Sequence, residues 1–74
     1  MSDVSNKVLA MSKPYLGPAA ESFIAKQCKA HLKIEVGDLT TAHLKDLSSW
    51  IFISGANIMD RAKALELSKK VAAL

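Results

Sequence analysis

The sequence LTTAHLKDLSSWIFISG, residues 39–55, has the most regular spacing of apolar side chains in the chain. At about 100° per residue, Leu44, Leu47 and Ile51 fall on one line, which predicts an amphipathic helix with one buried face. An Asp or Thr side chain near its start can cap this helix, and Gly55 can end it in a left-handed conformation. Residues 39–55 therefore predict the central helix of the protein.

The same helix carries two large apolar side chains, Phe52 and Ile53, that lie off this line. They project away from the core face, on the side that also holds Lys45 and Ser49. A helix that is apolar on two sides needs a second covering surface, from another helix of the chain or from a second protein molecule. The alternative is a β-strand over residues 50–53, since β-branched and aromatic residues favour strands, but no second strand-like run could pair with it.

Three further segments have apolar side chains at helical spacing and are bounded by proline, glycine or a capping residue. They predict a short first helix over residues 3–12, a second helix over residues 18–32 and a last helix from about residue 58 toward residue 74. Between the first two, Pro14 and the pair Gly17-Pro18 predict a break in the chain.

The fold class expected from these segments is all-α. The connections are short, so helices that are adjacent in sequence should be neighbours in space. The sequence predicts a small compact bundle of three main helices plus a short N-terminal helix, with crossing rather than coiled-coil packing. A single domain is expected over residues 1–74, with the short helix and the break in residues 1–17 and a three-helix core in residues 18–74. The core anchors expected from the spacing are Phe23, Ile24, Leu44, Leu47, Trp50, Ile51, Leu67 and Val71.

Length and composition limit the classes of protein to which the chain can belong. It has 74 residues, one cysteine and a formal net charge of +3. One cysteine allows no intrachain disulfide and fits a reducing compartment, and the N-terminal residues are unlike a signal or transit peptide. No apolar run reaches the roughly 20 residues that a bilayer span needs. We therefore expect a cytoplasmic protein that does not associate with membranes.

The sequence contains no arrangement typical of catalysis. Its carboxylates are scattered, and no nucleophile elbow, phosphate-binding loop or dinucleotide fingerprint occurs. Cys28 and His31 lie one helical turn apart, and with His43 they could supply three metal ligands, but no second Cys/His pair is present. We expect Cys28 and His31 to face the core and His43 to have a capping or packing role. The chain should thus be no enzyme and hold neither a cofactor nor a metal ion.

The apolar side chains without a place in the predicted core indicate how the protein acts. We expect a non-catalytic protein-interaction or dimerisation module whose partner is another protein, including a second copy of this chain. The predicted contact surface is formed by Phe52 and Ile53 of the central helix with Leu65 of the last helix, and Lys45 and Ser49 lie beside it.

The alternative function is a DNA- or RNA-binding regulatory domain of the helix–turn–helix type. Lys26, Lys29 and Lys33 form a basic stripe that could contact phosphates. However, the helix that would then read the bases directs Phe52 and Ile53 outward, rather than the Arg, Asn or Gln side chains that contact base edges. A lysine face that keeps an apolar domain in solution explains the stripe equally well.

Overall fold

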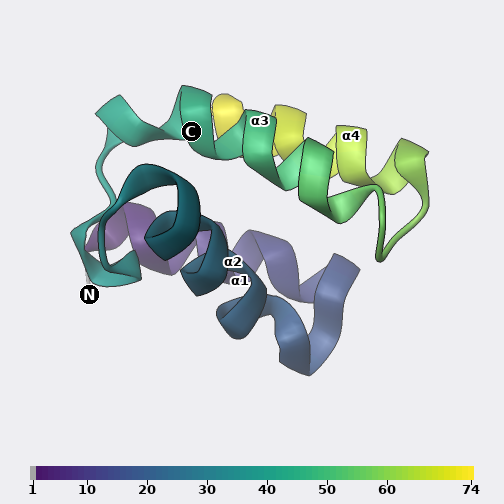
Figure 1. Cartoon of the computed structure of the whole chain (residues 1–74), viewed down its shortest axis with the longest axis horizontal. Helices are drawn as coiled ribbons and strands as arrows, with labels where there is room; N and C mark the ends of the chain where they lie inside the picture. Colours follow the sequence, from purple (N-terminus) through teal and green to yellow (C-terminus); the bar gives the residue numbers. More distant parts are fainter. Residues whose placement is uncertain (1) are drawn as a thin grey trace.

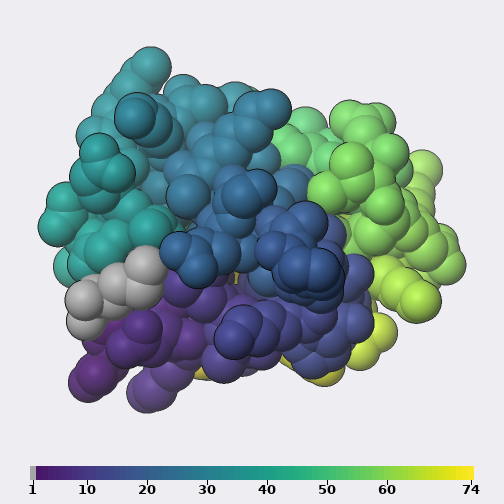
Figure 2. All heavy atoms as spheres, turned by 90° about the horizontal axis from the view of Figure 1, so that it is seen from below, coloured from purple at the N-terminus to yellow at the C-terminus, as the bar shows by residue number. Residues whose placement is uncertain are grey.

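The computed structural model describes residues 2–74, which form four α-helices and no strand. Figure 1 shows α3 and α4 side by side and antiparallel, with α1 and α2 packed against them as a second layer. Figure 2 shows the atoms of α1 (purple) and α2 (blue) next to each other on the face of the molecule that lies away from α3 and α4. The all-α bundle expected from the sequence is confirmed. The alternative of a β-strand over residues 50–53 is wrong, because these residues lie in α3. The helices are α1 (Asp3–Leu16), α2 (Ala20–Gln27), α3 (Leu44–Gly55) and α4 (Arg61–Ala72).

The N-terminal helix is longer than the sequence predicts. An end of this helix at residue 12 is wrong, because α1 continues through Pro14 to Leu16. The break expected at Gly17-Pro18 is present, since a 3-10 turn over Gly17–Ala19 separates α1 from α2. Proline removes the N–H that would bond the carbonyl of Ala10, four residues earlier. Ala10 and Pro14 are both exposed, so water can solvate this carbonyl and the helix continues. The helix ends at Gly17, whose φ of 58° suits glycine.

The core lies between the two layers. All of the expected anchors are buried except Trp50, which is half-buried. The structure adds Val8 and Leu9 of α1, together with Leu39 from the connection before α3. Docking of α1 thus extends the core beyond the three main helices. This contribution stabilises the fold, since a chain of this length has little apolar surface to spare.

Short helical turns connect α2 to α3. The segment Cys28–Leu32 winds as a π-helical turn and ends at Lys33, which has a left-handed φ of 60°. Two 3-10 turns follow, Val36–Asp38 and Thr41–His43. The backbone N–H of Thr40 donates to Nδ1 of His43 over 3.0 Å, which confirms the capping role expected for this histidine.

Gly55 lies where α3 meets α4 and the turn between them. The expectation that Gly55 ends the helix in a left-handed conformation is wrong: it is a helical residue, followed by a right-handed Ala56. A Cβ atom at Gly55 would lie 3.5 Å from the Cβ of Ala64 and 3.1 Å from the Cε of Met59. The turn then leads to Asp60, whose carboxylate accepts from the N–H of Ala62 over 3.2 Å and caps α4 as expected.

Candidate interaction surface

The outward side of α3 holds four of the side chains that the sequence assigns to partner binding. Ile53 is 55% exposed, Phe52 is half-buried, and Lys45 and Ser49 are exposed. The hydroxyl of Ser49 donates to the carbonyl of Lys45 over 3.3 Å. Because Lys45, Ser49 and Phe52 are separated by three or four residues, they lie along one strip of the helix.

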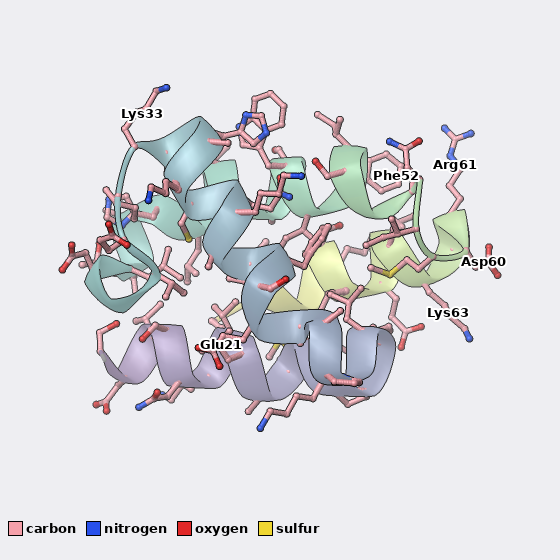
Figure 3. All side chains as sticks on the ribbon, turned by 60° about the horizontal axis from the view of Figure 1, so that its bottom comes forward. Glu21, Lys33, Phe52, Asp60, Arg61 and Lys63 are labelled. Carbon is pink, nitrogen blue, oxygen red and sulfur yellow. The ribbon has the colours of Figure 1, made fainter. Side chains whose placement is uncertain are left out.

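Arg61 at the start of α4 reaches this side of α3. The guanidinium carbon of Arg61 is 5.9 Å from the centre of the Phe52 ring, a cation–π distance, and Figure 3 shows these two side chains together at one end of the α3–α4 pair. Leu65 follows Arg61 by one turn of α4 and is 43% exposed. The name outer α3–α4 face is used here for the predicted surface, namely Lys45, Ser49, Phe52 and Ile53 of α3 together with Leu65 of α4.

The basic stripe is interrupted by carboxylates. Lys26, Lys29 and Lys33 are all exposed. One groove of about 470 Å³ is lined by Lys26, Lys29 and Glu35. A neighbouring groove of about 410 Å³ is lined by Lys29, Lys33, Glu35 and Asp38. The nearby negative charges lower the positive potential that a nucleic-acid backbone would need.

The candidate metal ligands point in different directions. Cys28 is buried, and this burial raises the pKa of its thiol. His31 is exposed and stacks on Trp50, with ring centres 3.7 Å apart and planes inclined by 3°. The expectation that His31 faces the core is therefore wrong, because the π-helical turn changes the direction of side chains relative to an α-helix. Across residues 2–74, no three His, Cys, Asp or Glu side chains converge on a site for a metal ion.

A small polar network joins α1 to α4. The hydroxyl of Tyr15 donates to Oε1 of Glu66 over 2.8 Å, and the ammonium of Lys70 is 3.4 Å from the same oxygen. The Tyr15 hydroxyl and then Lys70 lower the pKa of the Glu66 carboxyl, while Tyr15 and then Glu66 raise the pKa of Lys70. All the charges are exposed, so this network contributes little to stability. The sequence does not predict the part played by Tyr15, because the first helix is expected to end before it.

A third groove, of about 300 Å³, lies between α2 and the end of α3. Gln27 lines it and is only 4% exposed, and the hydroxyl of Ser54 donates to Oε1 of Gln27 over 2.9 Å. This site was not predicted from the sequence. The feature that could have indicated it is a glutamine among the apolar residues on the inner face of the second predicted helix.

Comparisons of the chain with protein-family models, with curated protein sequences and with solved structures find no match. No helix in the described part of the chain combines the length and the apolar composition needed to cross a bilayer.

Proposed function

We propose that this protein is a non-catalytic interaction module that pairs with a second copy of itself through the outer α3–α4 face. The observation that supports the proposal is the exposure of Ile53 (55%) on α3 and of Leu65 (43%) on α4, together with the half-buried Phe52. Single exposed apolar residues need no explanation, whereas a group of them on one face is typical of an interface. Covering this face would add roughly 25 cal/mol for each Å² of apolar surface removed from water.

The charges and sizes on this face suit a two-fold contact with itself. Such a contact brings the same patch of two molecules together. In an antiparallel pairing of two α3 helices about Ser49, the small serine allows close approach and Lys45 of one copy lies opposite Ile53 of the other. The carbon stem of lysine can cover the isoleucine while its ammonium reaches water. Asp46 then faces Phe52 and the Arg61 that lies over it, which pairs opposite charges.

The size of the protein limits the strength of this pairing. A standard interface covers about 800 Å² on each partner, which is about a fifth of the 4408 Å² surface of this molecule. One helix face cannot provide much more. We therefore propose a dimer that forms in the micromolar range rather than an obligate one.

The proposal of a non-catalytic role is supported by the titratable groups. The pKa shifts of Cys28, Glu66 and Lys70 have structural causes, namely burial of the thiol and an exposed pair beside Tyr15. Perturbed groups at an active site would instead be expected to face a common cleft. A single buried thiol also fits the cytoplasmic location that we propose for this module.

Nucleic-acid binding by Lys26, Lys29 and Lys33 is the function that we favour less. Glu35 and Asp38 line the same grooves as these lysines. A protein that binds phosphates through a basic stripe gains most where no carboxylate competes for the lysines.

Sedimentation analysis over a range of protein concentrations tests the proposed pairing. The wild type should shift from monomer to dimer as concentration rises, and Ile53→Asp should remain monomeric. Ile58→Asp is the matched control, because Ile58 is also an exposed isoleucine (60%) but lies in the turn after α3. Far-UV circular dichroism checks that each variant is folded. A wild type that stays monomeric at all concentrations, or an Ile53→Asp variant that dimerises as the wild type does, would refute the pairing.

A further inference from the structure

The turn at the end of α2 is attached to α3 by a contact between two rings. The imidazole of His31, in the π-helical turn Cys28–Leu32, stacks on the indole of Trp50, with ring centres 3.7 Å apart and planes inclined by 3°. His31 is exposed and Trp50 is half-buried. The imidazole therefore covers one face of an indole that lies at the surface.

The geometry of this contact is unfavourable for two uncharged rings. Uncharged aromatic rings prefer offset or edge-to-face arrangements with centres about 4.5–7 Å apart, because the negative faces of eclipsed rings repel. Parallel planes with centres 3.7 Å apart leave little offset, since the ring atoms are already at van der Waals distance. A cation above the face of a tryptophan is instead attracted by it, and planar cations stack on aromatic faces. The stack is therefore stronger when His31 is protonated.

No other contact in the described part of the chain holds the imidazole of His31. The chain has two histidines. The other one, His43, accepts at Nδ1 from the N–H of Thr40, which requires that this nitrogen carry no proton. His31 forms no hydrogen bond and no ion pair with any residue in the range 2–74. Its ring nitrogens are open to water, and Trp50 is the group that senses the charge of the ring.

The cations around His31 do not distinguish the stacked ring from the unstacked one. Lys26 of α2 lines the same groove as His31, and Lys29 and Lys33 lie within two residues of it. These lysines belong to the same stretch of chain as His31, so they stay near its ring in both states and oppose its protonation in both. The indole attracts the charged ring in the stacked state alone, which couples protonation to stacking.

The acidic groups near this contact act in the same direction as the indole or lie elsewhere. Asp46 is exposed on α3, one turn before Trp50, and its charge attracts a protonated ring stacked on that helix. Glu35 and Asp38 line the grooves beside the lysines, but no carboxylate lines the groove to which His31 belongs.

We propose that the stack of His31 on Trp50 is a pH-sensitive latch between the π-helical turn and α3, which closes more firmly when His31 is protonated. Histidine is the side chain whose charge ordinarily changes between about pH 5 and pH 8. A cation–π contact at an exposed site favours the stacked state by about two- to fivefold. A rise in pH through this range therefore loosens the latch and uncovers one face of Trp50. The latch does not depend on pairing through the outer α3–α4 face.

The fluorescence of Trp50, the single tryptophan of the chain, tests this proposal. Acrylamide is an uncharged quencher that reaches the indole more readily when its face is uncovered, so it reports the fraction of molecules in which the latch is open. In the wild type this fraction should fall by about two- to fivefold from about pH 8 to about pH 5. The protein is kept dilute enough to remain monomeric, and far-UV circular dichroism checks that it is folded at both pH values.

Three variants assign the response to the charge of one ring. His31→Gln has a planar but uncharged group, and its Trp50 should be equally accessible at both pH values. His31→Arg carries a planar cation at either pH, and at about pH 8 it should protect Trp50 as well as the wild type does at about pH 5. His43→Gln is the matched control, because it removes the other histidine while glutamine preserves the capping box, and it should respond to pH as the wild type does.

Each of four results would overturn the proposal. The first is a wild type in which acrylamide reaches Trp50 equally at both pH values, and the second is a His31→Gln variant that keeps the wild-type response. The third is a His31→Arg variant in which Trp50 is as accessible at about pH 8 as it is in His31→Gln. The fourth is loss of the response in His43→Gln, which would assign it to the cap of α3 instead.

Discussion

Replacing Leu39 with alanine should lower the free energy of unfolding by about 3 kcal/mol. Leu39 lies in the connection between two 3-10 turns, yet its side chain is fully buried. Truncation of a buried leucine removes apolar atoms and leaves a cavity, at a cost of about 2–5 kcal/mol. The hydroxyl of Ser2 donates to the carbonyl of Leu39 over 2.7 Å. This bond restrains the backbone against collapsing into the cavity, so we expect a loss in the middle of that range.

A loss of this size is large for a protein of 74 residues. At about 0.05–0.15 kcal/mol per residue, its total stability should be about 4–11 kcal/mol. Each 1 kcal/mol shifts the melting temperature of a domain of this size by about 4–8 °C. The Leu39→Ala variant should therefore melt about 12–24 °C below the wild type.

Thermal and urea unfolding, followed by circular dichroism, measure this difference. All variants are compared at one protein concentration, low enough to keep them monomeric. Leu65→Ala is the control, since Leu65 is 43% exposed and its truncation should change stability by no more than about 0.5 kcal/mol. If Leu39→Ala loses no more stability than Leu65→Ala, the connection before α3 is not part of the core.

Three further predictions concern single contacts. Gly55→Ala should stay within about 1 kcal/mol of the wild type, because alanine favours the helix and the flexible end of Met59, 3.1 Å from the new Cβ, can move. The larger side chain of Gly55→Val should clash with Ala64 and destabilise the protein by about 1–3 kcal/mol. Thermal melts distinguish the two variants. Tyr15→Phe should raise the pKa of Glu66 in an NMR titration. Since folding lowers that pKa from 4.5, the small loss of stability should be seen above pH 4.5 and vanish as pH falls through the folded-state value. The thiol of Cys28 is buried and its pKa is raised, so a disulfide reagent should modify it rapidly in urea but only very slowly in the native protein.

Helical periodicity predicts most of the core because the buried residues of a helix recur at a fixed angle. Leu44, Leu47 and Ile51 fall on one line and are all buried. Leu39 shows where this reasoning stops: a single apolar residue in a connection has no period, and only its tertiary neighbours decide whether it is buried. The length of α1 is a second example, because the cost of Pro14 inside a helix depends on whether water can reach the carbonyl of Ala10.

The two candidate sites differ in how far the sequence predicts them. The apolar pattern around Phe52 and Ile53 belongs to one helix, and so the exposure of Ile53 can be anticipated from it. The groove beside Gln27 depends on Ser54, which is far along the chain and meets Gln27 only when α2 packs against α3. The spacing of residues within one helix cannot predict a hydrogen bond between side chains of two different helices.

The four successive side chains from Trp50 to Ile53 explain why an uncovered surface remains. Each step of about 100° directs one of them to a different environment. Ile51 enters the core, Trp50 stacks on His31, and Phe52 lies beneath Arg61. Ile53 is directed to the remaining side of α3 and stays 55% exposed. Lys45 and Ser49 are exposed as well, so the bundle leaves the outward side of α3 open, and the pairing that we propose would cover apolar surface there.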